Sequence, residues 1–267
     1  MRDILKKIQV NMPFRMLVDR YLPMVLEEKI NPEIGFDCFV LDSFRKEDFL
    51  KVAGMLRDEG LTITFHAPFY DLRPGAVDRR IREVTIERLN QVFELVPCFK
   101  PESIVCHPSF DSRYYVSNDD LWLENSRDTW MRFLAMAHGM DTVIVLENVY
   151  ESNPEILNRL INSLSSKFDN IRFCFDTGHF NAFSNASLEK WMESLGTCIG
   201  EIHLHDNDGR TDEHAPVGEG NFPFRRFFEF LSESDIRPII TIEPHTEENF
   251  RHTLKNIKNM KLLDYLD

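Results

Sequence analysis

The chain has 267 residues, 43% of them hydrophobic, and a formal net charge of −13. Its length and its 22 phenylalanines provide ample material for a buried core, which excludes disordered, collagen-like and coiled-coil classes. No apolar run is long enough to span a membrane and no secretory leader is visible, so we expect a cytoplasmic protein. The negative net charge disfavours a nucleic-acid partner without excluding one.

Short β-rich runs alternate with longer helical patterns along the chain. The predicted strands cover residues 8–12, 38–41, 62–66, 103–107, 142–147, 172–176, 199–205 and 239–243. Several are nearly continuous apolar runs, which is typical of parallel strands buried on both faces. The predicted helices cover residues 16–29, 46–59, 78–96, 119–138, 154–166, 188–195, 224–233 and 247–263. The pattern is clearest in 78–96, where apolar residues recur at helical spacing beside charged ones.

Eight strand–helix units in a chain of this length predict an α/β fold, a single closed (β/α)8 TIM barrel. A doubly wound open sheet is the alternative. No linker or charge block marks a boundary, so residues 1–267 are interpreted as one domain. The polar stretch 206–220 is interpreted as a long loop after the seventh strand.

The strongest functional signal lies at the ends of six consecutive predicted strands, the third to the eighth. Each ends in a metal-ligating or acid–base side chain, and the set comprises His66, His107, Glu147, Asp176 with His179, His203 with His205, and Glu243 with His245. Any one of these could be a helix cap or a structural residue. Together they are the residue types that bind divalent metals, and the barrel brings all strand ends to one face. We therefore predict a metal site at the C-terminal face of the strands.

The loop after the seventh strand adds a weaker signal. Its sequence DEHAPVGEG places Asp212 and His214 two residues apart, a spacing at which both can bind one ion. Gly218 and Gly220 then supply a tight turn. With His66, His107, Glu147, Asp176, His179, His203 and Glu243, this pair completes a possible donor shell of five histidines and four carboxylates.

These residues resemble the xylose-isomerase-like barrel superfamily, which contains sugar isomerases and epimerases and the endonuclease IV class of abasic-site nucleases (AP endonuclease family 2). The most specific pieces are FCFDTGH at 173–179, HLHDNDG at 203–209 and DEHAPVGEG at 212–220. The resemblance implies the barrel fold and two ligand patterns. The three-zinc nuclease pattern is matched at His66, His107, Glu147, Asp176, His179, His203, Asp212, His214 and Glu243. The one-metal isomerase pattern is matched at Glu147, Asp176, His203 and Glu243, a subset of the first.

Departures from the nuclease pattern favour a small-molecule enzyme. The nuclease branch usually has Asn-Asp-Ser where this chain has His205-Asp206-Asn207, and a lysine where it has Glu219. A carboxylate at Glu219 would repel phosphate. The short link from Met12 to the first predicted helix also leaves little room for a DNA-penetrating loop.

Two enzyme functions therefore stay open, beside a third, non-enzymatic possibility of a degenerate barrel that binds a ligand or a partner. The first is a metal-dependent isomerase or epimerase of a sugar, sugar phosphate, keto-sugar or polyol. The resemblance implies that Glu147 and Glu243 transfer the proton around one Mn²⁺, Co²⁺, Mg²⁺ or Zn²⁺ ion. His205 and His245 are candidate substrate-binding residues. The second is a phosphodiesterase with two or three Zn²⁺ ions held by the nine-residue set. Substrate, metal count and oligomeric state are not determined by the sequence.

Overall fold

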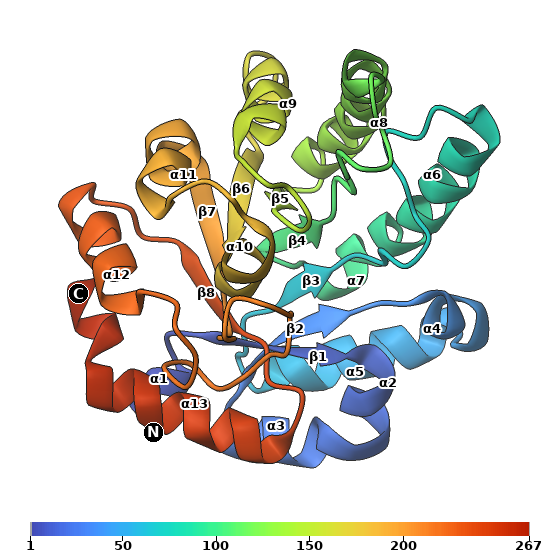
Figure 1. The fold of residues 1–267 in the computed structure, drawn as a ribbon. Coiled ribbons are helices and arrows are strands. Elements are labelled where there is room, and N and C mark those ends of the chain that lie inside the picture. The colour runs from blue at the N-terminus through green and yellow to red at the C-terminus, as the bar shows by residue number, and fades with distance from the viewer. Residues whose placement is uncertain (1, 267) are drawn as a thin grey trace.

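Eight parallel strands close into a barrel in the computed structural model, which describes residues 2–266 (Figure 1). The strands are β1 (Gln9–Pro13), β2 (Asn31–Gly35), β3 (Thr64–His66), β4 (Ser103–Cys106), β5 (Val143–Glu147), β6 (Ile171–Asp176), β7 (Ile199–Leu204) and β8 (Ile239–Ile242). Each strand pairs with the next, and the barrel closes where Gln9 and Val10 of β1 lie opposite Thr241 and Ile242 of β8. The predicted TIM barrel is confirmed, and the open-sheet alternative is excluded.

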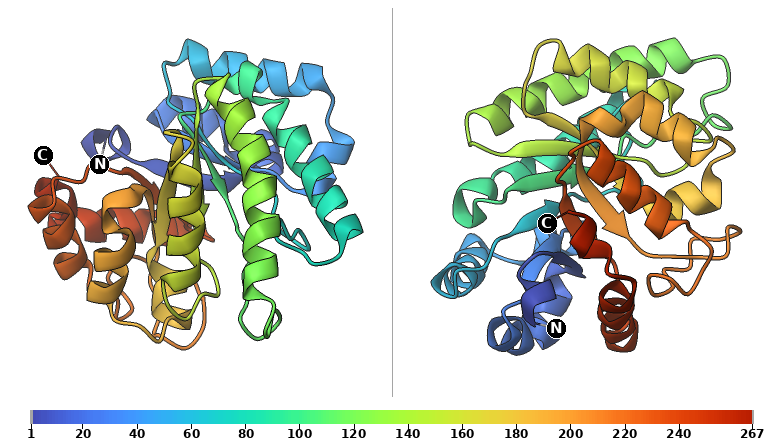
Figure 2. Two further views of the ribbon diagram at one scale, coloured as in Figure 1. Left: turned by 90° about the horizontal axis from the view of Figure 1, so that it is seen from above. Right: turned by 90° about the vertical axis from the view of Figure 1, so that its left-hand side faces the viewer.

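Helices surround the barrel on its outside, as two further directions of view also show (Figure 2). The α-helices are α1 (Arg2–Leu5), α2 (Phe14–Met16), α3 (Leu22–Glu28), α4 (Cys38–Ser43), α5 (Lys46–Asp58), α6 (Arg79–Phe93), α7 (Val96–Phe99), α8 (Asp119–His138), α9 (Glu155–Ser165), α10 (Thr177–Phe183), α11 (Leu188–Leu195), α12 (Phe224–Glu233) and α13 (Glu247–Met260). Three further turns are the π-helix η1 (Leu17–Tyr21) and the 3-10 turns η2 (Gly196–Cys198) and η3 (Leu262–Tyr265). No helix in the described range is long and apolar enough to cross a membrane.

The predicted strand at 38–41 is wrong. These residues begin helix α4, which Asp37 starts by accepting a hydrogen bond from the Val40 backbone N–H at 2.7 Å. The second strand is β2, seven residues earlier. Its sequence NPEIG contains a proline and two polar side chains, so it lacks the apolar run that marks the other strands.

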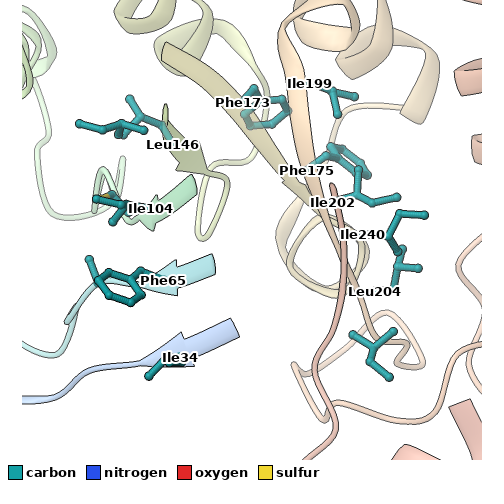
Figure 3. Packing of buried hydrophobic residues seen from close by; sticks show 14 of the residues in the cluster. Ile34, Phe65, Ile104, Leu146, Phe173, Phe175, Ile199, Ile202, Leu204 and Ile240 are labelled. Atoms are coloured by element: carbon teal, nitrogen blue, oxygen red, sulfur yellow. The ribbon is translucent and has the colours of Figure 1, made fainter. Parts of the chain in front are cut away.

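The strand side chains divide into two layers because successive residues point to opposite faces of a strand. Phe65, Ile104, Leu146, Phe173 and Phe175 belong to the large cluster that packs against the surrounding helices (Figure 3). A separate small cluster comprises Val105, Val145 and Cys174, the alternate positions of β4, β5 and β6. Toward the C-terminal ends, these alternate positions become polar and titratable. The pattern therefore delivers ionisable side chains into one end of the barrel.

Candidate metal centre

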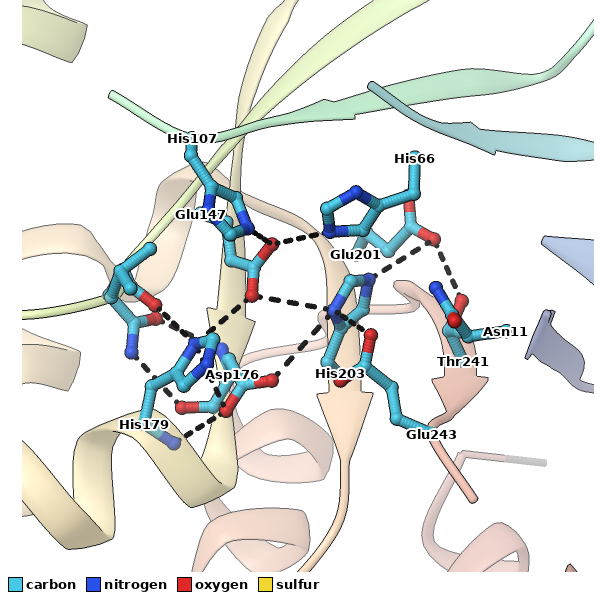
Figure 4. Close-up of polar contacts among 12 residues, drawn as sticks. Asn11, His66, His107, Glu147, Asp176, His179, Glu201, His203, Thr241 and Glu243 are labelled. Atoms are coloured by element: carbon cyan, nitrogen blue, oxygen red, sulfur yellow. Dashed lines mark hydrogen bonds and ion pairs between the residues drawn. The ribbon is translucent and has the colours of Figure 1, made fainter. Parts of the chain in front are cut away.

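Side chains from six strands meet at the C-terminal end of the barrel (Figure 4). His66 and Glu147 are the last residues of β3 and β5, and Asp176 is the last of β6, where its carboxylate also caps helix α10 by accepting from the His179 backbone N–H. The set is completed by His107 after β4, His203 within β7, and Glu243 after β8. The structure thus brings together all six predicted strand ends.

Glu147 lies at the centre of the first group. Its Oε2 atom is 3.3 Å from His66 Nε2 and 3.0 Å from His107 Nε2, while its Oε1 atom is 3.1 Å from His179 Nδ1. The carboxylate is 1% exposed. One buried carboxylate therefore faces three imidazoles from three different βα units.

His203 connects this group to the opposite wall. Its Nδ1 atom is 3.1 Å from Glu243 Oε1, 3.6 Å from Glu147 Oε1 and 3.8 Å from Asp176 Oδ2. These four residues form the one-metal pattern, and they converge on a single ring nitrogen.

A third group is built around the loop between β7 and α12. Asp212 Oδ2 lies 3.3 Å from His179 Nε2 and 3.2 Å from His214 Nε2. His205 Nε2 is 3.0 Å from Asp176 Oδ2, which joins this group to the others. The loop is held by buried Asp206, whose carboxylate accepts from the backbone N–H groups of residues 218, 220 and 222 at 2.9–3.1 Å. All nine residues of the larger ligand pattern are therefore in contact through this network.

The donor set fits a divalent cation. Several buried ring nitrogens and carboxylate oxygens that face one another lack a hydrogen-bond partner of acceptable geometry, namely His107 Nε2, both oxygens of Glu147, His203 Nδ1, His205 Nδ1 and Asp212 Oδ1. Orphaned buried polar atoms are costly, and a cation at their centre would satisfy them together. Three-donor combinations with atoms within 4.8 Å of one another include His66–His107–Glu147 and His205–Asp212–His214. Imidazoles and carboxylates of this kind suit Zn²⁺ and related ions.

The mixture of imidazoles and carboxylates shifts the pKa values of Glu147, Glu243 and His66. Burial raises the pKa of Glu147 and Glu243, but the surrounding imidazoles outweigh burial and bring both pKa values below the ordinary glutamate value. Burial lowers the pKa of His66, but Glu147 raises it to about 9. Both carboxylates are thus charged at neutral pH, whereas a raised pKa would be better matched to a carboxylate base. A bound cation would displace the imidazole protons.

The two predicted substrate-binding histidines lie in different places. His245 is exposed and lines a cavity of about 210 Å³ beside Glu243. His205 is buried among the donors and is absent from the lining of this cavity. His214 stacks between them, with ring centroids 3.8 Å from His205 and 3.9 Å from His245.

Sequence reasoning missed a second layer of buried polar residues below the donors. Glu33 of β2 and Glu201 of β7 are both fully buried, and each contacts His203 Nε2, at 3.4 and 4.0 Å. Burial, together with the charge of Glu33, raises the pKa of Glu201 to about 8. Glu201 could have been found because it lies two residues before His203 in a strand and so shares its face. Glu33 was hidden by the unrecognised second strand.

Comparison with known proteins places this geometry in context. The model of a family described as the xylose isomerase-like TIM barrel matches residues 32–260. An uncharacterized protein from Methanocaldococcus jannaschii, MJ1311, is 31% identical over 220 residues, which are 79% of this chain and 73% of that protein. A probable endonuclease 4 from Mycoplasma pneumoniae is 28% identical over 208 residues, 69% of each chain.

Solved structures show the same fold at low sequence identity. A D-tagatose 3-epimerase-like protein superposes with a TM-score of 0.79 at 24% identity, covering 97% of this chain and 98% of the other. The TTHB071 protein from Thermus thermophilus, soaked with ZnCl2, gives a TM-score of 0.74 at 19% identity, covering 95% and 97%. These likenesses establish the barrel and leave the reaction open.

Proposed function

The chain belongs to the xylose isomerase-like TIM barrel family, and on that basis we propose that it is a metal-dependent isomerase or epimerase of a sugar, keto-sugar or related polyol. The observation that carries the proposal is the placement of Glu147 and Glu243. Both approach His203 Nδ1, at 3.6 and 3.1 Å, from strands β5 and β8 on different walls of the barrel. Two carboxylates that face a common space from different sides suit proton removal and return.

The cavity beside Glu243 supports a small and uncharged substrate. Its volume of about 210 Å³ is below the roughly 300–1,000 Å³ of sites for drug-sized ligands. It is lined by apolar side chains, including Met12, Met16 and Phe250, and by the polar Asn11 and His245. No lysine or arginine is among its described lining residues. A phosphorylated substrate would find no lysine or arginine there to pair with its phosphate, so we favour the unphosphorylated sugar over the sugar phosphate.

The proposed reaction gives each residue of the centre a separate role. Glu147, Asp176, His203 and Glu243 would hold one cation, which supplies polarisation of the substrate carbonyl and so acidifies the adjacent C–H bond. Glu147 and Glu243 would take and return the proton. His245 would donate or accept a hydrogen bond to a substrate hydroxyl at the cavity rim. His205 contacts Asp176 and His214 and is better placed to support the donor set than to touch substrate.

A second candidate is a zinc phosphodiesterase of the endonuclease IV kind. It is favoured by the contact network among all nine residues of the trinuclear pattern and by the similarity to probable endonuclease 4 proteins. Three features weigh against it. The cavity is lined by no lysine or arginine, Glu219 pairs with His252, and helix α2 starts directly after β1, which leaves no loop there to enter DNA.

The test combines metal content with two assays on the purified protein. We expect tightly bound divalent metal, epimerisation or isomerisation of unphosphorylated ketohexoses, and no cleavage of an abasic-site DNA duplex. Glu243→Gln should lower turnover by at least about 100-fold and leave the fold intact, because general acid–base residues contribute about 10²–10⁴ in rate. His138→Ala, on the outer surface in an ion pair with Asp169, is the matched control.

The outcomes separate the candidates. Abasic-site cleavage that needs His66 and two or three Zn²⁺ ions per chain would establish the phosphodiesterase. Full turnover in Glu243→Gln would remove this residue from the mechanism. A protein free of metal and inactive in both assays would refute both enzyme functions.

A further inference from the structure

The buried layer below the donors contains two carboxylates that neither ligand pattern includes. Glu33 and Glu201 come from β2 and β7, and both are fully buried. They approach the same atom, His203 Nε2, whereas Glu147 and Glu243 approach Nδ1 on the other side of the imidazole. An isolated buried carboxylate is costly, so each needs a structural reason to be there.

The two carboxylates differ in the hydrogen bonds that they already accept. Glu201 accepts from the Ser103 hydroxyl at 2.6 Å with one oxygen and from the Thr241 hydroxyl at 2.8 Å with the other. Glu33 accepts from the Asn11 side-chain amide at 2.7 Å with Oε1, and its Oε2 has a longer contact of 3.3 Å with the Thr64 hydroxyl. Glu33 Oε2 is also the closer to the ring, 3.4 Å from His203 Nε2 against 4.0 Å for Glu201.

Strand register fixes this arrangement. Asn11 pairs with Glu33 across β1 and β2, and Glu33 pairs with Thr64 across β2 and β3, so the three side chains lie in one row inside the barrel. Glu33 cannot turn away without losing both neighbours. The carboxylate is therefore held in position below the imidazole.

A neutral imidazole has one nitrogen that carries a proton and one that offers a lone pair. His203 presents Nδ1 to Glu243, Glu147 and Asp176, and it presents Nε2 to Glu33. If Nδ1 carried the proton, the Nε2 lone pair would face the Glu33 carboxylate and repel it. If Nε2 carries the proton, it donates to Glu33, and the Nδ1 lone pair is directed at the donor space.

We propose that Glu33 is a positioning residue, which accepts the Nε2–H of His203 and so holds its Nδ1 lone pair toward the metal centre. The proposal rests on the metal dependence in the proposed function but not on the reaction. Carboxylate partners of metal-binding histidines fix the tautomer and ring orientation, and their loss lowers metal affinity by about 10–100-fold.

The test measures zinc affinity by competition with a chromophoric chelator on the full chain after metal removal. Glu33→Leu should weaken zinc binding by about 10–100-fold. Glu33→Gln keeps a neutral acceptor and should fall between Glu33→Leu and the wild type. Glu201→Leu is the matched control, since it removes a carboxylate of equal burial from the same layer, and its affinity should stay within about threefold of the wild type.

A spectroscopic readout separates positioning from packing. Nitrogen-15 NMR of protein labelled at histidine should report the Nε2–H tautomer for His203 in the wild type and in Glu201→Leu, with His203→Gln used for assignment. The signal should change in both Glu33 variants. Unchanged tautomer and affinity in Glu33→Leu, or an equal loss of affinity in Glu201→Leu, would overturn the proposal.

Two further outcomes are distinguishable. If Glu33→Leu does not fold, Glu33→Gln decides, and an unchanged tautomer with unchanged zinc affinity refutes the positioning role. Zinc binding that depends on Glu33, in a protein without isomerase or epimerase turnover, would refute the proposed reaction and support the positioning role.

Discussion

Gly178 lies where helix α10 passes closest to the buried histidine of the third donor group. A Cβ atom built on Gly178 would lie 2.0 Å from His205 Cε1, 2.2 Å from Nδ1 and 2.7 Å from Nε2. All three distances are well inside van der Waals contact. The His205 ring cannot easily give way, because its Nε2 is 3.0 Å from Asp176 Oδ2 and its face stacks on His214. Glycine is therefore required here by close approach.

Gly178→Ala should lower both stability and metal content. Forcing a methyl group into a packed site costs about 1–3 kcal/mol, and the better helix propensity of alanine returns about 1 kcal/mol. The net expectation is a loss of up to about 2 kcal/mol in the free energy of unfolding, or up to about 8 °C in Tm for a chain of this size. Displacement of His205 should also reduce the zinc bound per chain.

The matched control is Gly54→Ala in helix α5, where the nearest atom to the new Cβ is Arg57 Nη2 at 3.9 Å. This variant has the helix benefit without the clash, so it should gain up to about 1 kcal/mol and keep its metal. Urea unfolding and metal analysis of both variants measure the contrast. If Gly178→Ala gained stability like Gly54→Ala and kept its full metal content, the placement of His205 against α10 would be refuted.

Three further predictions concern the rest of the barrel. Burial raises the pKa of Glu151 from 4.5 to about 7, so the folded state binds an extra proton between these values and loses stability as the pH rises through them. Glu151→Gln should remove up to about 3 kcal/mol of this loss in the free energy of unfolding between pH 5 and 8. Urea unfolding across this pH range measures the effect, and an unchanged dependence of stability on pH would contradict it. Asp206→Asn should cost at least about 1–3 kcal/mol, because each oxygen of Asp206 accepts from two backbone N–H groups and the amide nitrogen would leave one such pair without an acceptor; an increased hydrogen-exchange rate around the 206–220 loop is the measurement. Phe175→Ala should cost about 3–5 kcal/mol because the ring is fully buried between Trp191 and Phe227, and a loss below 1 kcal/mol on thermal unfolding would show that the helical layer can collapse into the space.

The barrel could be predicted because most of its strands are continuous apolar runs in the sequence. Strand β2 could not, because its inner face carries Asn31 and Glu33 and its second residue is a proline. The helix that follows, α4, was mistaken for the strand because its short CFVL segment is apolar, and a run of four residues has no period to distinguish the two structures. The error placed one strand on a helix, and Glu33 was therefore not recognised as a barrel residue.

The candidate donors could be predicted because the fold places them at strand ends, where sequence position alone indicates which face they occupy. Residues that act deeper in the barrel lack this signal. Glu201 looks like an isolated charge in an apolar strand, and its partners Ser103 and Thr241 are 98 and 40 residues away along the chain. Only the closed sheet shows that they share a layer.

The loop that carries Asp212 and His214 is relevant to whether the number of bound metal ions indicates the reaction. His214 has a φ angle of 49°, in the left-handed region that residues other than glycine rarely adopt, and the loop around it is held by three backbone hydrogen bonds to Asp206. Such a conformation persists where the surrounding structure imposes it, often at functional sites. The four residues proposed to hold the cation do not include Asp212 and His214, so their placement leaves a donor pair for a second cation. A second cation is compatible with either chemistry. The number of ions per chain alone therefore cannot assign the reaction, and the ketohexose and abasic-DNA assays must be read together with it.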